Sequence, residues 1–168
     1  MLKLLASDHM DPYALLLRAL GGDTLPDIVR DEGGKPRFFG RPDLHFNVSH
    51  SGPYALCGLS DKNIGVDIET IRPRRTLLVQ KALSPEEYQW YLDQGGRWSD
   101  FYSLWTLKEA RVKQSGRGLD RPPRSIAVPL LNPGGVAPLD SLTFAAYGGS
   151  GWRAAVCTEG ETAPLVWL

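Results

Sequence analysis

This chain has few cysteines and no net charge. Its two cysteines, Cys57 and Cys157, each lie in an apolar run, which favours reduced core thiols over a disulfide framework or a metal site. Its 19 basic and 19 acidic residues cancel, so no overall field favours nucleic acid or a membrane surface as a partner. No run is long enough to span a membrane, and residues 1–6 are too short for a signal-peptide core. We expect a cytoplasmic protein.

The patterns that are present mix helices and strands, as in an α+β protein. A chain of 168 residues with 42% apolar and 23% charged residues can bury a real core. Apolar spacing and capping signals predict helices at residues 13–20, 76–82, 84–94 and 99–116. Apolar runs between turn residues predict strands at residues 44–51, 54–60, 64–69, 125–130, 141–147, 152–157 and 165–168. A helix followed by strands occurs twice, which suggests two related halves, placed at residues 1–62 and 63–168.

The strand at residues 64–69 alternates strictly between apolar and other residues, which predicts one buried and one open face. A turn at 61–63 should join it to strand 54–60 as an antiparallel hairpin. Asp67 and Glu69 then project side by side from the open face. Unpaired, they would repel each other, so they call for a cation such as Mg²⁺. A solvated polar face with two acids remains the plain alternative.

Two further stretches carry candidate ligands for an anion. Strand 44–51 ends in Ser49, His50 and Ser51, and neutral donors with a histidine suit a phosphate. A surface histidine is the plain alternative at that position. A turn at 32–36 delivers Lys35 to a loop, where a solvated lysine is the default.

The longest predicted helix combines an apolar stripe with a charged pair. Phe101, Leu104, Trp105 and Val112 recur at helical spacing and make the stripe. Glu109 and Lys113 are four residues apart, so they share one face and could form a routine surface salt bridge. Because Trp105 lies one turn before Glu109, however, the pair sits at the rim of the stripe, where half-buried carboxylates are candidates for function.

Four sequence blocks in register resemble the signatures of one enzyme family. They read GGKP at 33–36, FNVSHS at 46–51, GVDIE at 65–69 and WTLKEARVK at 105–113. In order and rough spacing they resemble the signature blocks of the 4′-phosphopantetheinyl transferase superfamily, in its long, pseudo-dimeric Sfp-type branch. The resemblance covers about residues 33 to 118, and the closing strands are also similar.

The resemblance implies an α+β fold of two pseudo-symmetric halves with the active site between them. It also implies a Mg²⁺-dependent reaction, in which the 4′-phosphopantetheine arm of coenzyme A moves to a serine of an acyl or peptidyl carrier protein and 3′,5′-ADP is released. The carrier is expected to be acidic around its serine, and two halves in one chain favour a monomer. Candidate docking residues are Arg72, Arg74, Arg75, Arg111 and Arg117, although a solvated surface is an equal alternative.

The family's site residues carry over to matching positions of this chain. Asp67, Glu69 and Glu109 resemble the Mg²⁺ ligands. Lys113 resembles a ligand of the coenzyme A phosphate. The remaining coenzyme A contacts by resemblance are Lys35, Ser49 and His50. Phosphoryl transfer needs charge neutralisation and positioning, so we expect Asp67, Glu109 and Lys113 to be catalytic. Glu109 is the first choice of general base and Glu69 the second.

One departure from the family concerns the amino-terminal half, which is shorter than usual. Only 45 residues precede Phe46, and the basic residues there that could grip a nucleotide phosphate are Arg18, Arg30, Arg37 and Arg41. An alternative is therefore a module that binds coenzyme A or a carrier protein without turnover. A different metal-dependent phosphotransferase is a third hypothesis, against which stands the lack of a Walker-type loop or of kinase motifs.

Overall fold

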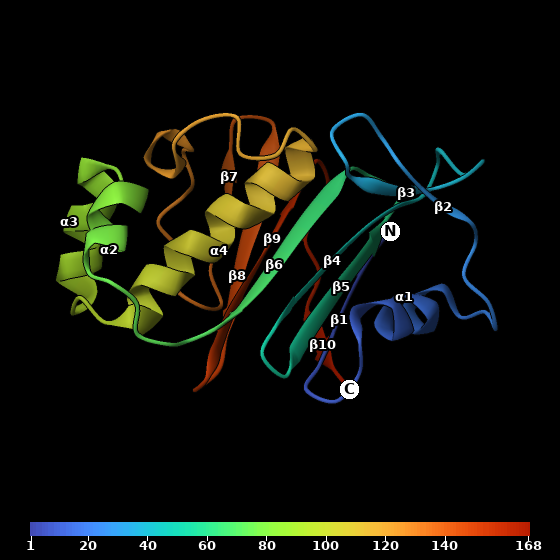
Figure 1. Ribbon diagram of the computed structural model, residues 1–168, viewed down its shortest axis with the longest axis horizontal. Helices are drawn as coiled ribbons and strands as arrows, with labels where there is room; N and C mark the ends of the chain where they lie inside the picture. Colours follow the sequence, from blue (N-terminus) through green and yellow to red (C-terminus); the bar gives the residue numbers. More distant parts are fainter.

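The computed structural model describes all 168 residues, which form two four-stranded sheets lying side by side with helices on their outer faces (Figure 1). The helices are α1 (Pro12–Leu20), α2 (Leu77–Ala82), α3 (Pro85–Gln94), α4 (Trp98–Ser115) and the 3₁₀ turn η1 (Pro123–Ser125). The strands are β1 (Leu2–Ser7), β2 (Ile28–Arg30), β3 (Pro36–Phe38), β4 (His45–Ser51), β5 (Tyr54–Ser60), β6 (Ile64–Thr70), β7 (Val136–Leu139), β8 (Leu142–Gly148), β9 (Trp152–Thr158) and β10 (Leu165–Trp167). The expected α+β class is confirmed.

The first sheet has the strand order β10-β1-β5-β4, antiparallel except for the parallel pair β1 and β10. Helix α1 covers one face of it, and its buried Leu15 and Leu16 pack with Phe46 of β4. The helix begins where the Asp11 carboxylate accepts hydrogen bonds from two backbone N–H groups. It ends at Gly21, whose left-handed backbone lets the chain turn away.

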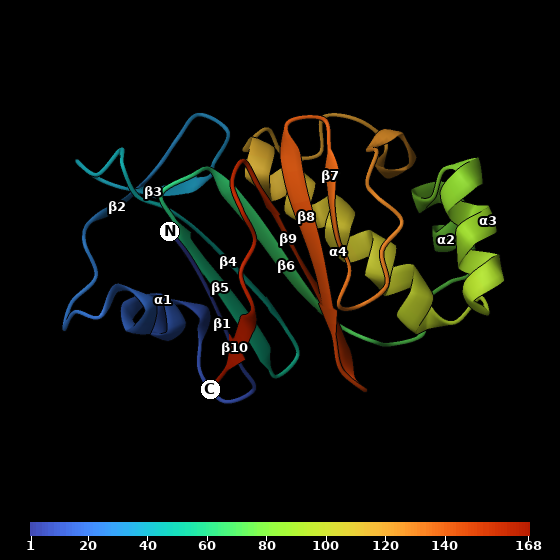
Figure 2. The ribbon, with the colours of Figure 1, turned by 180° about the vertical axis from the view of Figure 1, so that it is seen from behind.

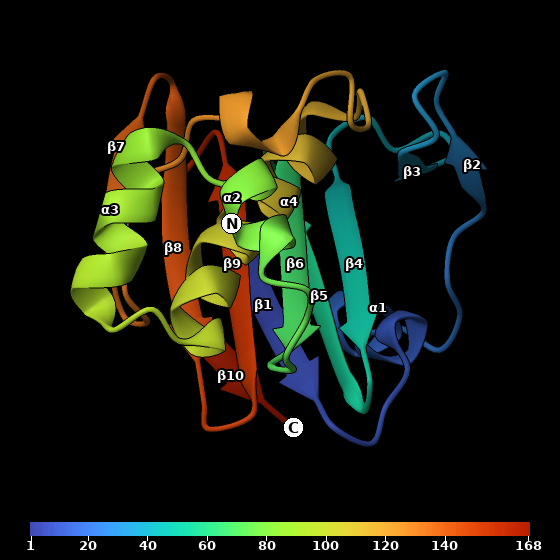
Figure 3. The same ribbon diagram turned by 60° about the vertical axis from the view of Figure 1, so that its left-hand side comes forward.

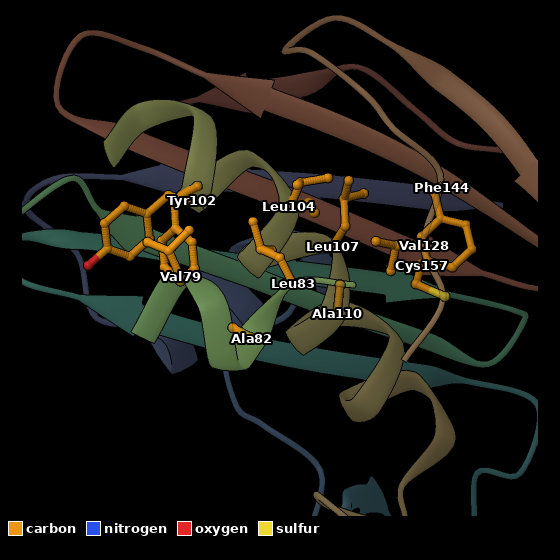
Figure 4. Close-up of a cluster of buried hydrophobic side chains, with 12 residues drawn as sticks. Val79, Ala82, Leu83, Tyr102, Leu104, Leu107, Ala110, Val128, Phe144 and Cys157 are labelled. Carbon is orange, nitrogen blue, oxygen red and sulfur yellow. The ribbon is translucent and has the colours of Figure 1, made fainter. Parts of the chain in front are cut away.

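The second sheet has the order β6-β9-β8-β7, and α4 lies across its outer face (Figure 2). Leu104 and Leu107 of α4 meet Phe144 of β8 in a closed apolar cluster (Figure 4). Helices α2 and α3 form an outer layer against the same cluster. The predicted capping box of α3 is confirmed, because Ser84 and Glu87 bond reciprocally.

Strand β6 is buried on both faces, so the expectation of an open face was wrong. Ile64, Val66 and Ile68 pack between the two sheets in a second apolar cluster. On the other face α4 comes so close that a side chain on Gly65 would lie 2.1 Å from the carbonyl oxygen of Ala110. Sequence alternation could not reveal this cover, because the helix that provides it lies about 40 residues later in the chain.

The predicted hairpin between residues 54–60 and 64–69 was also wrong. β5 pairs with β1 and β4, whereas β6 pairs with β9, Asp67 lying opposite Ala155. The turn after β5 therefore carries the chain from one sheet to the other (Figure 3). The last strand, β10, then returns to the first sheet and lies beside β1. Helix α1 covers the first sheet and the longer α4 covers the second.

The predicted strand at 125–130 does not form, and η1 is followed by irregular chain. The carbonyl groups of Ile126 and Ala127 accept hydrogen bonds from the side chains of Lys108 and Arg111, and Pro129 offers no N–H. These two carbonyls are thus satisfied without a neighbouring strand. Strands β1, β2, β3 and β7 were not predicted, whereas the other predicted helices and strands are found within a few residues.

Both cysteines are free and buried, as expected. Burial raises the pKa of Cys57 and of Cys157 to about 12, so both thiols stay protonated near neutral pH. No helix combines the length and the apolar character that crossing a bilayer requires.

Candidate active site

Asp67 is the centre of a polar site where β4, β6 and α4 meet. Its side chain is buried, and its Oδ1 accepts hydrogen bonds from the Ser49 hydroxyl at 2.9 Å and from the Lys113 ammonium at 2.7 Å. Its Oδ2 is equally buried and has no hydrogen-bond partner. Because an unpaired buried carboxylate oxygen is costly, this atom points to a site built for a further positive ligand.

Glu69 and Glu109 bring two more carboxylates near Asp67, from β6 and α4. Both are half-buried, and the Glu69 Oε2 accepts a hydrogen bond from the Ser51 hydroxyl at 2.8 Å. Burial raises the pKa of Asp67 to about 7, an effect that Lys113 opposes and that the charges of Glu69 and Glu109 reinforce. Burial also raises the pKa of Glu109, with Lys113 again opposing. The three acids therefore share one electrostatic environment, although as placed they do not form a closed metal-binding cluster.

Lys113 reaches across from α4 to Asp67 and does not pair with Glu109. Its ammonium donates to Asp67 Oδ1 and, at 3.0 Å, to the Ser49 hydroxyl. The surface salt bridge between Glu109 and Lys113 that helical spacing allows is therefore absent, because a more buried acid lies within reach. The lysine side chain is 29% exposed, so its charge also faces solvent.

Lys35 connects three segments of the protein through hydrogen bonds. Its ammonium donates to the Asn63 side chain at 2.6 Å, to the Ile64 carbonyl at 2.8 Å and to the Gln114 carbonyl at 2.9 Å. These three bonds use all its N–H groups and tie the loop before β3 to β6 and to the end of α4. Burial lowers the pKa of Lys35 to about 8.

Ser49 and His50 are neighbours on β4 but have opposite environments. Ser49 is buried against β6, whereas His50 is exposed and, by strand alternation, points to the other side of β4. The structure thus brings Ser49 together with Asp67 and Lys113, and leaves His50 apart from them.

A cavity of about 300 Å³ opens beside Lys113. Its walls come from α1, β4, the end of α4 and the loop that carries the GGKP block: Tyr13, Arg30, Gly33, Gly34, Lys35, Pro36, Asn47, Val48, Val112, Lys113, Gly116 and Gly118. Arg30, Lys35 and Lys113 give it three basic side chains, and the glycines let a ligand approach the backbone. Of the four candidate arginines before Phe46, Arg30 is the one that lines this cavity.

One buried cation on α4 was not predicted from the sequence. Lys108 is 1% exposed, and its ammonium donates to Glu87 of α3 and to the carbonyls of Pro123 and Ile126. The available signal was its position one turn beyond Leu104, which places it toward the core. It fixes the helix turn that carries Glu109.

Comparison with known proteins identifies the family. Residues 63–157, more than half of the chain, match the family model described as the 4′-phosphopantetheinyl transferase superfamily. A 4′-phosphopantetheinyl transferase of Bacillus subtilis is 40% identical over 111 residues, which are 63% of this chain and 48% of that protein. The transferase Sfp of Bacillus subtilis strain 168 is 39% identical over 108 residues, 63% of this chain and 48% of its own length.

Relatives in Salmonella carry the same transferase name. The transferase AcpT of Salmonella typhi is 42% identical over 107 residues, covering 61% of this chain and 55% of AcpT. The chain spans about half the length of the curated relatives it matches. The expected resemblance is confirmed, since the match covers the acidic strand and the long helix that meet at Asp67. This chain belongs to the 4′-phosphopantetheinyl transferase superfamily.

Proposed function

We propose that this chain transfers the 4′-phosphopantetheine arm of coenzyme A to a serine hydroxyl of an acyl or peptidyl carrier protein and releases 3′,5′-ADP. The observation that carries the proposal is the unpartnered Oδ2 of Asp67, which lies among two further acids and Lys113 beside a cavity with cationic walls. The relatives are named as transferases of this group.

Asp67, Glu69 and Glu109 are the residues that would hold Mg²⁺. Their oxygens are the hard ligands that this ion prefers, and Asp67 Oδ2 is an acceptor left without a donor, so the residues fit the ion. When bound, Mg²⁺ neutralises charge on the pyrophosphate and so favours departure of 3′,5′-ADP. The Lys113 side chain suits a phosphate oxygen, and the cavity beside it would take part of coenzyme A.

The proton of the carrier serine needs an acceptor, and Glu109 is our first choice. Its raised pKa makes it a stronger base than an exposed glutamate, and α4 holds it next to Lys113. As the serine oxygen bonds to phosphorus, the bond from phosphorus to 3′,5′-ADP breaks and the serine proton passes to the Glu109 carboxylate. Glu69 is the second choice of base.

Intact-mass measurement tests the proposal directly. The protein is incubated with coenzyme A, Mg²⁺ and an apo carrier protein, and the carrier should gain one phosphopantetheine mass. Asp67→Ala should abolish this gain and keep the fold, whereas Asp93→Ala, which changes an exposed acid on α3, should react like the parent. Transfer by Asp67→Ala at the parental rate would contradict the metal site.

A second candidate function is binding of coenzyme A without turnover. It is favoured by Lys113, which occupies Asp67 Oδ1 directly, and by the lack of a closed acidic cluster. Calorimetric binding of coenzyme A without any mass gain on a carrier would support this candidate. A mass gain supports the transferase.

The carrier protein would dock near the chain that leaves β6. Arg72, Arg74 and Arg75 are exposed there, directly after the strand that carries Glu69. Arg111 is less suited, because it pairs with Asp140 and the Ala127 carbonyl. If the three arginines steer an acidic carrier, transfer at sub-saturating carrier should slow as salt shortens the Debye length below ~8 Å. Transfer that is insensitive to salt would rule out steering.

A further inference from the structure

The seam between the two sheets is made by side chains of β4. Strands β4 and β6 are the facing edges of separate sheets and are not paired by backbone hydrogen bonds. Three β4 side chains instead accept the N–H groups of β6 at every second residue. Asn47 accepts from Val66 at 2.9 Å, Ser49 from Ile68 at 3.2 Å and Ser51 from Thr70 at 3.1 Å.

The two serines differ from the asparagine because a hydroxyl also has a proton to donate. Ser49 donates to Asp67 Oδ1 at 2.9 Å, and Ser51 donates to Glu69 Oε2 at 2.8 Å. The same unit therefore occurs twice in register: each serine bonds a carboxylate 18 residues later and the next backbone N–H 19 residues later. The repeat coincides with the two acids of the strand.

The hydroxyl of Ser49 has no capacity left for another ligand. It donates its one proton to Asp67 and accepts from the Ile68 N–H and from Lys113, which fills both lone pairs. A contact with coenzyme A, as the resemblance implies for Ser49, would require breaking one of these bonds. The hydroxyl is instead directed at the carboxylate.

We propose that Ser49 and Ser51 are positioning residues for Asp67 and Glu69. Each serine holds one oxygen of its carboxylate, so that the other oxygen is left for the cation; for Asp67 this is the unpartnered Oδ2. A carboxylate already held in one orientation loses less conformational freedom when it binds an ion. The inference rests on the proposed function in one respect: the cation is the Mg²⁺ that is used for transfer.

Ser51 offers the sharper test because it is only half-buried, so that its variants should fold. Mn²⁺ replaces Mg²⁺ as the probe, and its affinity is measured by electron paramagnetic resonance without coenzyme A. Ser51→Ala should weaken Mn²⁺ binding by roughly 10- to 100-fold, as is typical when a partner of a metal ligand is lost. Ser51→Thr retains the hydroxyl and should restore most of the affinity.

Thr70→Val is the matched control, since the Thr70 hydroxyl donates to the Ser51 carbonyl across the same seam but bonds no carboxylate. It should lower the free energy of unfolding about as much as Ser51→Ala and leave Mn²⁺ affinity unchanged. A Ser51→Ala protein with parental Mn²⁺ affinity would overturn the positioning role, and a loss confined to coenzyme A affinity would make the serine a ligand contact. A parent that binds Mn²⁺ but transfers nothing contradicts the proposed function alone, whereas a parent that binds no Mn²⁺ contradicts both.

Discussion

The close approach of α4 to β6 predicts that Gly65→Ala damages both stability and activity. The added Cβ would lie 2.1 Å from the Ala110 carbonyl oxygen and 2.3 Å from the Gln114 backbone nitrogen. These are backbone atoms, so they retreat only if the helix moves, and reaching an ordinary 3.4 Å contact from 2.1 Å needs a displacement of about 1.3 Å. Overpacking of this kind typically costs about 1–3 kcal/mol.

The same displacement would separate two of the proposed catalytic residues, which lie on the two elements. Lys113 is carried by α4 and Asp67 by β6, and their 2.7 Å contact spans the interface that the new methyl group would wedge open. A misplacement of about 1 Å can cost 10²-fold in rate, so we expect a loss of transfer of about that size. The activity loss should persist at temperatures where the variant is fully folded.

Urea denaturation and the intact-mass transfer assay together measure these two effects. Gly22→Ala is the control, because a Cβ there would meet nothing closer than the Thr24 carbonyl oxygen at 3.8 Å. Its free energy of unfolding should stay within about 0.5 kcal/mol of the parent. A Gly65→Ala protein with parental stability and parental transfer rate would refute the close packing of α4 on β6.

Two further predictions concern buried lysines. Lys108→Met should lower the free energy of unfolding by about 3–5 kcal/mol, because Glu87 would be left as an uncompensated buried charge. Adding Glu87→Gln should recover part of that loss in urea denaturation, and equal stability of the single and double variants would contradict the ion pair. For Lys35, the folded-state pKa of about 8 lies below the unfolded value, so the unfolded chain binds the extra proton between about pH 8 and pH 10. Stability contributed by this group should therefore rise with pH through that window in the parent and not in Lys35→Met, and identical pH profiles would argue against a buried ammonium.

Local signals in the sequence predicted those elements whose start and end are encoded by neighbouring residues. The Asp11 cap and Gly21 bound α1, and the Ser84 capping box bounds α3, because these bonds form within a few residues. The strands that were missed are short or depend on distant partners. β1, which was missed, pairs with β5 and β10, both more than 45 residues away in the sequence. The predicted strand at 125–130 stays irregular where side chains of α4 bond the carbonyls of Ile126 and Ala127. Contacts between residues far apart in the sequence leave no periodic pattern in the local sequence.

In the candidate site, too, the residues could be predicted from the sequence but their long-range contacts could not. Sequence patterning and resemblance singled out Asp67, Glu69, Glu109 and Lys113, and the structure gathers them at one place. Patterning and resemblance could not predict which hydrogen-bond partner each side chain has. The Lys35 ammonium donates to two backbone carbonyls and a side-chain amide, and the Ser49 hydroxyl donates to Asp67. These partners depend on how two sheets and a helix meet, which the local sequence does not encode.

The pairing of β10 with β1 has a consequence for how the protein is made. β1 leaves the ribosome well before β10, and one of its edges stays unpaired until residues 165–167 have been synthesised. At about 5–20 residues per second, that edge is exposed for many seconds. During synthesis this outer edge of the nascent first sheet is therefore a surface on which another chain could add a strand, and a chaperone that shields it would raise the yield of folded protein.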